Sequence, residues 1–129
     1  MLVIDANVAA AACGGGDGFE AFDDELASVP LMWSETRASL HLKLHKEEIN
    51  REDAEIIHGR LDNCPVQRKD PPELGAEAWR IAEEFGWGRT YDAEYVALAK
   101  LLGCRLVTLD ARLRRGTDRL GFVVTPAEL

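Results

Sequence analysis

Four acidic residues stand where an α/β fold would gather side chains with a shared chemistry. Asp5 and Asp110 each follow a short apolar run that predicts a buried strand. Glu35 and Asp92 are each expected in the first turn of a helix, where a negative charge is favourable. Several carboxylates held close together repel one another, so either some take up protons or a cation binds between them. Mg²⁺ prefers such oxygen ligands and completes its shell with water and phosphate oxygens, which makes phosphodiester cleavage the chemistry to expect.

Each of these acids also has a simple structural explanation. An aspartate after a strand is a common turn residue, and an acid in the first turn stabilises its helix without any other role. For any one of the four, the structural explanation is the more frequent one. The coincidence of four acids in equivalent places favours a functional site.

The elements that must position these acids follow from the hydrophobic pattern of the chain. Short apolar runs predict strands, and longer segments with helical spacing or capping residues predict helices. Strands are expected at 2–4, 29–33, 66–68, 105–109 and 122–125, and helices at 6–12, 19–26, 34–48, 51–64, 71–85 and 91–102, with a short one around Leu113. Such alternation predicts a parallel sheet covered by helices on both faces, with ligands bound outside the carboxyl ends of the strands. The chain shows no repeat or linker, so residues 1–129 are expected to form one domain.

The charge of the chain limits the ways in which it could bind nucleic acid. The formal net charge of −8 argues against a protein that grips nucleic acid over a broad face. The imbalance is local, because residues 1–30 carry six acids and no Lys or Arg, whereas residues 101–129 carry five Arg and three acids. Arg112, Arg114 and Arg115 lie within five residues after Asp110, and contact with the phosphates of a substrate is as good an explanation for them as a solvated helix face.

The same composition indicates the compartment. No apolar run approaches the roughly 18 residues that a membrane helix requires, and the first residues lack the basic start of a secretory signal. The three cysteines, Cys13, Cys64 and Cys104, are widely spaced and form no C-x-x-C pair. A cytoplasmic protein without membrane association is therefore expected.

Four segments together resemble a known family. Their sequences are Leu-Val-Ile-Asp-Ala-Asn-Val at 2–8, Trp-Ser-Glu at 33–35, Tyr-Asp-Ala-Glu-Tyr-Val-Ala-Leu-Ala at 91–99 and Leu-Val-Thr-Leu-Asp-Ala-Arg-Leu at 106–113. They are similar to the four motif blocks of PIN-domain ribonucleases. In length and order the chain most resembles the VapC toxins of bacterial and archaeal toxin–antitoxin pairs. No single block is specific, but the four in this order are.

The resemblance implies a fold, an activity and partners. The fold would be a three-layer α/β/α sandwich around a parallel sheet of four or five strands. The activity would be that of a Mg²⁺-dependent endoribonuclease, with Mn²⁺ as an alternative ion, and the partners would be an RNA substrate, a small antitoxin protein and a second copy of the chain. The implied catalytic and metal-binding residues are Asp5, Glu35, Asp92 and Asp110, with Thr108 two positions before the last acid and Asn7 in support of the first. The glycine-rich stretch 14–18 departs from the family, which usually has a longer helix there.

Three alternative interpretations agree less well with the sequence. A phosphatase would use a nucleophilic aspartate with a second acid two positions later, but Asn7 stands two positions after Asp5. A degenerate module that only binds RNA or protein would not be expected to keep all four acids. His41 and His45 have the spacing of zinc ligands on one helix, but no third ligand is obvious.

Overall fold

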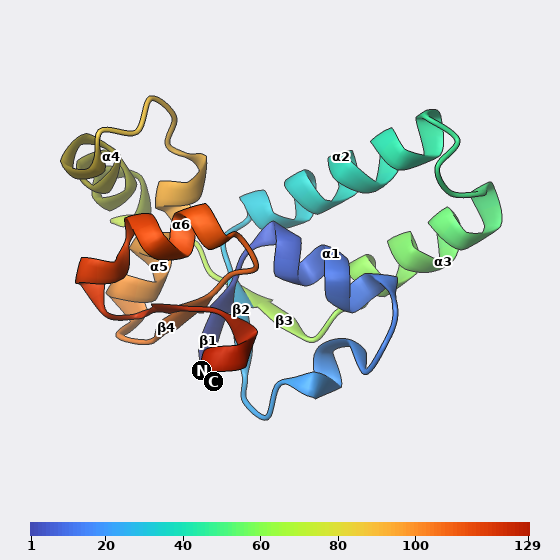
Figure 1. The fold of residues 1–129 in the computed structure, drawn as a ribbon, viewed down its shortest axis with the longest axis horizontal. Helices are drawn as coiled ribbons and strands as arrows, with labels where there is room; N and C mark the ends of the chain where they lie inside the picture. The colour runs from blue at the N-terminus through green and yellow to red at the C-terminus, as the bar shows by residue number, and fades with distance from the viewer.

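The computed structural model describes residues 1–129, which form a five-stranded parallel sheet with helices on both sides (Figure 1). The strands are short, and their order across the sheet is β3-β2-β1-β4-β5. Every neighbouring pair is parallel, with Val3 opposite Ala27 on one side and Leu106 on the other. Their bounds are β1 Leu2–Ile4, β2 Leu26–Ser28, β3 Val66–Arg68, β4 Arg105–Val107 and β5 Val123–Val124. The predicted α/β class with a parallel sheet is confirmed.

Five of the six α-helices form the two groups that cover the sheet. Helices α1, α2 and α3 pack against one another on one side, whereas α5 packs on β1 and β4 and carries α4 on its outer surface (Figure 1). Their bounds are α1 Ala6–Gly14, α2 Leu31–His45, α3 Arg51–Asp62, α4 Leu74–Phe85, α5 Tyr91–Leu102 and α6 Ala111–Gly116. Three 3₁₀ turns, Gly18–Ala21, Asp118–Leu120 and Pro126–Glu128, complete the chain. None of the helices is long and apolar enough to cross a membrane.

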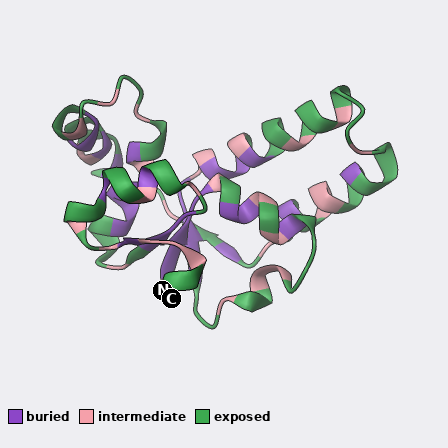
Figure 2. Cartoon of the chain, viewed as in Figure 1, coloured by how far each residue is buried: buried purple, intermediate pink, exposed green.

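Burial explains why such short strands hold together. The three residues of β1 are all buried, and its Val3 and Ile4 have no exposed surface (Figure 2). Helix α5 is buried from Tyr95 to Ala99, because small alanines let it lie close to the sheet while Val96 and Leu98 fill the core. A central parallel sheet covered on both faces needs continuous apolar runs rather than alternating ones, as this sequence supplies.

The strand predicted at 29–33 is wrong, and the error moves one of the four acids. The strand on this side is β2, at 26–28, and α2 already begins at Leu31. Pro30 has the helical φ of −54° at the N-cap position, which suits the start of a helix. Ser34 is therefore not an N-cap, and Glu35 lies in the second turn of α2 instead of the first.

Other boundaries differ less. The helix predicted at 19–26 is only the turn Gly18–Ala21, and the helix expected from Pro71 begins at Leu74. The last two strands are shorter than expected by two residues each. Two end signals are confirmed: Asn50 caps α3 through the backbone N–H of Asp53, and Gly103 ends α5 in the left-handed conformation.

Helices α2 and α3 form a hairpin that extends away from the sheet (Figure 1). Arg37 joins them, because its guanidinium donates to Asp62 Oδ1 at 2.9 Å and to His58 Nε2 at 3.0 Å. Most of the residues near the hairpin's tip are exposed, which distinguishes it from the buried strands (Figure 2).

Candidate active site at the carboxyl edge of the sheet

The four acids lie where the strand order changes direction. From β1 the chain builds outward through β2 and β3, and it then returns to place β4 on the other side of β1. Asp5 follows β1, and Asp110 follows β4 after two residues. Crevices at this position, outside the carboxyl ends of strands, are where open α/β sheets bind ligands.

Asp5 is a buried carboxylate held from two sides. Only 5% of the residue is exposed. Its Oδ1 accepts a hydrogen bond of 3.0 Å from the backbone N–H of Val8, so it caps α1. Its Oδ2 accepts one of 2.5 Å from the Thr108 hydroxyl. The orientation of this carboxylate is therefore fixed before any ligand binds.

Thr108 connects the first acid to the last. Its hydroxyl donates to Asp5 and accepts from the backbone N–H of Asp110 at 3.0 Å. Asp110 in turn caps α6, because its Oδ1 accepts from the N–H groups of Arg112 and Leu113 at 2.9 and 3.2 Å. Both Asp5 and Asp110 use Oδ1 as a helix cap, and Asp110 Oδ2 is left for a ligand.

Glu35 is oriented by a residue that the sequence did not single out for the site. The Tyr95 hydroxyl donates a 2.5 Å hydrogen bond to Glu35 Oε1. Burial, and then this bond to the carboxylate, raise the pKa of Tyr95, so the hydroxyl keeps its proton and stays a donor. Tyr95 lies one helical turn after Asp92, and this spacing was the available signal, although it also fitted a core residue.

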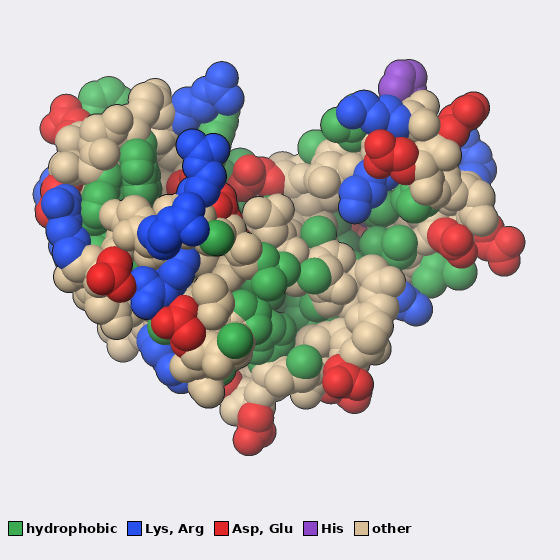
Figure 3. Space-filling model, viewed as in Figure 1, with side chains coloured by type: hydrophobic (Ala, Val, Ile, Leu, Met, Phe, Trp, Pro, Cys, Tyr) green, Lys and Arg blue, Asp and Glu red, His purple; other side chains and the backbone are tan.

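Three of the acids open into one cleft. The cleft has a volume of about 830 Å³ and takes its walls from α2, the loop between α4 and α5, the start of α5, and α6. Its lining residues are Glu35, Gly86, Trp87, Gly88, Arg89, Tyr91, Asp92, Asp110, Arg112, Leu113 and Gly116. In Figure 3 acidic side chains are visible at the hollow between the sheet and the hairpin, and Lys and Arg side chains lie beside it. Asp5 is absent from the lining because it is buried.

The acids influence one another. Burial raises the pKa of Asp5 above its usual value despite the opposing hydrogen bonds from Thr108 and Val8, and the charges of Asp92 and Asp110 add to the increase. Burial also raises the pKa of Asp92, with further contributions from Asp110 and Glu35. Negative charge on Asp5 and Asp92 is thus disfavoured by burial and by the neighbouring acids, and this is the condition under which a cation binds.

The sequence of nearly the whole chain matches the family model described as the PIN domain, over residues 2–118. The chain belongs to the PIN-domain family. It is 32% identical over 115 residues to Ribonuclease VapC9 of Mycobacterium tuberculosis, and the matched segment covers 88% of each chain. The VapC ribonuclease Mb0985 of Mycobacterium bovis matches to the same extent.

Solved structures share the fold of this PIN domain. PAE2754 from Pyrobaculum aerophilum superimposes with a TM-score of 0.70 at 25% identity, covering 98% of this chain and 91% of that one. A chain from a structure described as a toxin–antitoxin complex from Klebsiella pneumoniae gives the same TM-score at 18% identity, and the match covers 98% of both chains. The three-layer architecture expected from the motif blocks is confirmed.

The acids of the PIN domain fit a hydrated divalent cation better than a fully protein-ligated one. No three Asp, Glu, His or Cys side chains are placed so that they could hold one ion together. Mg²⁺ is commonly bound by one or two carboxylates, with water in the remaining positions. The oxygen donors, the raised pKa values of Asp5 and Asp92, and the open cleft suit that mode of binding.

The other residues expected at the site differ in their surroundings. Asn7 is exposed on α1, and its side chain forms no hydrogen bond with Asp5, whose hydrogen bonds come from Val8 and Thr108. Arg112 lines the cleft, and Arg115 is exposed on α6. Arg114 is engaged elsewhere, because its guanidinium pairs with Glu128 at 2.8 Å and with Asp118 at 2.7 Å.

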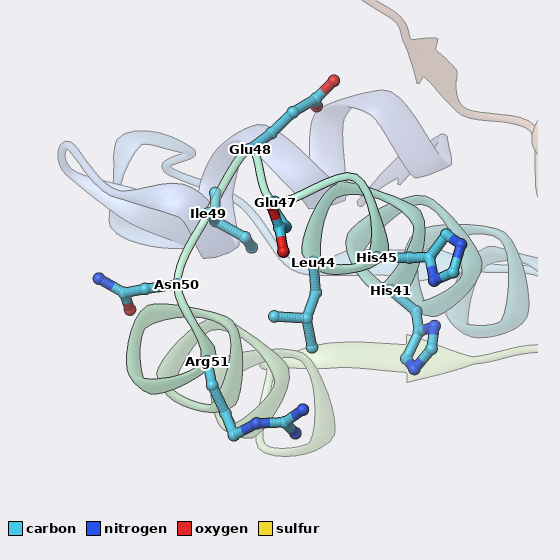
Figure 4. Close-up of a pocket in the computed structure, with 8 residues that line it drawn as sticks. All are labelled: His41, Leu44, His45, Glu47, Glu48, Ile49, Asn50 and Arg51. Carbon is cyan, nitrogen blue, oxygen red and sulfur yellow. The ribbon is translucent and has the colours of Figure 1, made fainter.

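The two histidines of α2 lie far from this chemistry. His41 and His45 line a separate cavity of about 550 Å³ at the tip of the hairpin (Figure 4). Their rings lie on the same side of α2, while Glu48 points away from both. No third ligand joins them in a metal-holding group, so these two residues keep the structural explanation.

The mutual repulsion of the acids predicts how stability responds to pH. We expect Asp92→Asn to melt at the same or a higher temperature than the parent at neutral pH without metal. The folded state holds a proton on Asp92 at a higher pH than the unfolded state does, so the parent loses stability as pH rises through the raised pKa. The variant's advantage should therefore shrink as pH falls. Thermal melts in EDTA across this range provide the measurement, and a large loss of stability at neutral pH would mean that Asp92 has a structural role.

Proposed function

We propose that this PIN domain is a divalent-metal-dependent endoribonuclease and the toxin of a toxin–antitoxin pair, acting in the cytoplasm as a single domain of residues 1–129. The observation that carries the proposal is the cleft in which Glu35, Asp92 and Asp110 meet above the buried Asp5. The relatives that match the chain over 88% of its length carry the name ribonuclease, which supports RNA as the substrate.

The residues have separate tasks in this proposal. Asp5, Asp92 and Asp110 would hold Mg²⁺ or Mn²⁺, at most two of them directly and the rest through water, with Glu35 at the outer side of the site. The ion, when bound, would lower the pKa of a water molecule and neutralise charge on the phosphate. Thr108 fixes Asp5 in one orientation, and the Tyr95 hydroxyl does the same for Glu35. The expected products carry a 5′-phosphate and a 3′-hydroxyl.

Arginines beside the acids would bind the RNA backbone. Arg112 lines the cleft and takes part in no ion pair, so its guanidinium is available to a phosphate. Arg115 is exposed on the same helix and could contact a neighbouring phosphate. Arg114 would have to leave Asp118 and Glu128 first. We therefore expect Arg112 to contribute most, Arg115 less and Arg114 least.

A small antitoxin is the proposed inhibitor, and a second copy of the chain is the proposed dimer partner. The shared fold with a chain described as part of a toxin–antitoxin complex supports an antitoxin. The charge of this chain suggests how inhibition would work, since a carboxylate can accept two parallel hydrogen bonds from an arginine that competes with the metal. The acid-rich residues 1–30 would add attraction for a cationic segment.

This mechanism of inhibition makes a prediction about the operon. The product of the neighbouring gene should co-purify with the chain and suppress RNA cleavage. Replacing the partner's arginines one at a time should restore cleavage for at least one of them, while the complex stays intact on a sizing column. If inhibition survives every replacement, the partner blocks RNA by covering another surface.

The activity itself is tested by incubating the purified chain with single-stranded RNA. Cleavage should occur in Mg²⁺ or Mn²⁺, stop in EDTA and return when the ion is restored. The fragments should be degraded by an exonuclease that requires a 5′-phosphate. Cleavage that continues in EDTA would contradict the metal-dependent reaction.

A further inference from the structure

We propose that Arg89 and Tyr91 form a binding subsite for one unpaired nucleotide next to the catalytic acids. This inference rests on the proposed ribonuclease function, since it names how the same cleft holds its substrate. In this subsite the ring of Tyr91 stacks on a base, and the guanidinium of Arg89 binds an adjoining phosphate.

The loop between α4 and α5 places both side chains in the cleft. Helix α4 ends at Gly86, which adopts the left-handed conformation at φ 70°. Trp87 then stacks on Phe85, with ring centroids 5.1 Å apart, and Phe85 packs on the core. The loop is therefore anchored at its base, and it delivers Arg89 and Tyr91 to the wall of the cleft.

Tyr91 has the position and the exposure of a stacking residue. It is the first residue of α5, directly before Asp92, and it lines the same cleft as three of the acids. Half of the residue, 52%, is exposed. An aromatic face of this kind stacks on any base, which contributes about 1–3 kcal/mol per base. A base in a duplex already stacks on its neighbours, so only an unpaired nucleotide can use the ring.

Arg89 supplies a cation that forms no ion pair with a carboxylate of the protein. It is exposed, lines the cleft and takes part in none of the ion pairs of the chain. Arg119, by comparison, is paired with Glu84 and lies over the Phe85 ring. In a cleft lined by acids, an unpaired guanidinium suits a phosphate, and Arg112 of α6 provides a second one from a different element.

The chain contains a matched control for the aromatic ring. Trp79 on α4 is more exposed than Tyr91, at 63%, but it does not line the cleft, and its indole N–H bonds to Glu83. If exposed aromatic rings bound RNA merely by being accessible, Trp79 would do so at least as well. A subsite instead predicts that only Tyr91 matters.

The test is binding of a fluorescently labelled single-stranded RNA 12-mer, followed by anisotropy in EDTA so that cleavage does not interfere. Tyr91→Ala should raise the Kd about 5- to 150-fold, the range that corresponds to loss of one stacked base. Tyr91→Phe should stay within about twofold of the parent, because it keeps the ring, and Trp79→Ala should bind as the parent does. Arg89→Ala should weaken binding and reduce the salt slope by about one. The same RNA annealed to its complement should bind less tightly to the parent, and Tyr91→Ala should remove that preference.

Each contrary result has a distinct meaning. Equal binding by Tyr91→Ala and the parent overturns the subsite, and the ribonuclease proposal survives if the parent still cleaves RNA in Mg²⁺. Loss of binding in Tyr91→Phe equal to that in Tyr91→Ala, with both variants showing the parent's thermal melt, overturns stacking in favour of a hydrogen bond from the hydroxyl. A parent that neither binds nor cleaves RNA overturns both proposals.

Discussion

Replacing Asp92 or Asp5 with asparagine should reduce RNA cleavage in Mg²⁺ about a hundredfold or more. Both carboxylates are placed where a cation would relieve charge that burial and neighbouring acids disfavour. Loss of a residue that merely supports a metal ligand lowers metal affinity or activity about 10- to 100-fold, so loss of a ligand should cost at least as much. Asparagine keeps the size of the side chain, and initial rates on a defined RNA give the measurement.

The control is a matched aspartate on another helix. Asp53 also lies in the first turn of its helix, α3, but it does not line the cleft. Asp53→Asn should cleave RNA at the parent's rate. Undiminished cleavage by both Asp92→Asn and Asp5→Asn would show that these acids are not the catalytic group.

Thr108→Val should lower both the free energy of unfolding and the cleavage rate. The hydroxyl has no exposed surface, and it is the donor to Asp5 Oδ2 and the acceptor for the Asp110 N–H. Valine has nearly the same shape but leaves both partners without this bond, which costs roughly 1–3 kcal/mol for a buried group. Asp5 would also lose its fixed orientation, so we expect activity to fall about 10- to 100-fold. Urea denaturation and initial rates measure the two effects.

The conservative variant separates these effects from a packing defect. Thr108→Ser keeps the hydroxyl and removes only a methyl group, so it should restore most of the activity at some cost in stability. If Thr108→Ser and Thr108→Val were equally inactive, the methyl group's packing, and not the hydrogen bonds to Asp5 and Asp110, would explain the role of this residue.

The strands next to the acids could be predicted because their sequence signals are local. Leu2–Ile4 is apolar throughout and Arg105–Val107 is apolar after its first residue, each ends before a polar residue, and a buried parallel strand requires little more. Helix α5 could be predicted equally well, since Gly103 ends it and its apolar residues follow helical spacing. The topology then brings Asp5 and Asp110 to one edge without any side-chain detail.

Glu35 shows where local signals are not enough. Pro30 fits either an interrupted strand or the start of a helix, and the buried Met32 and Trp33 fit both. Whether residues 29–33 form a strand or a helix depends on a tertiary contact. Residues 26–28 pair with β1 as β2, so the strand position beside β1 is already occupied. The partner of Glu35, Tyr95, lies 60 residues away in the chain, and its helical spacing from Asp92 fits a core residue equally well, so the hydrogen bond to Glu35 could not be predicted.

Ion pairs between residues far apart in the chain also determine which arginines are available to a substrate. In the sequence Arg112, Arg114 and Arg115 are equivalent members of one charged run. Only the folded chain brings Glu128 to Arg114, with the carboxylate and guanidinium 2.8 Å apart. Arg89 and Tyr91 gave no signal beyond a loop and a helix start, because their common cleft depends on α6 and α2 coming together.

The most direct test of the metal site is a Mg²⁺ titration of thermal stability, which is insensitive to traces of other ribonucleases. A ligand that binds only the folded state stabilises it by about 2.7 kcal/mol at a hundred times its Kd. We expect the melting temperature of the parent to rise with Mg²⁺ and to saturate, and that of Asp92→Asn and Asp5→Asn to stay nearly constant. An increase of the same size in the parent and both variants, or no increase in the parent at all, would contradict a metal site formed by these acids.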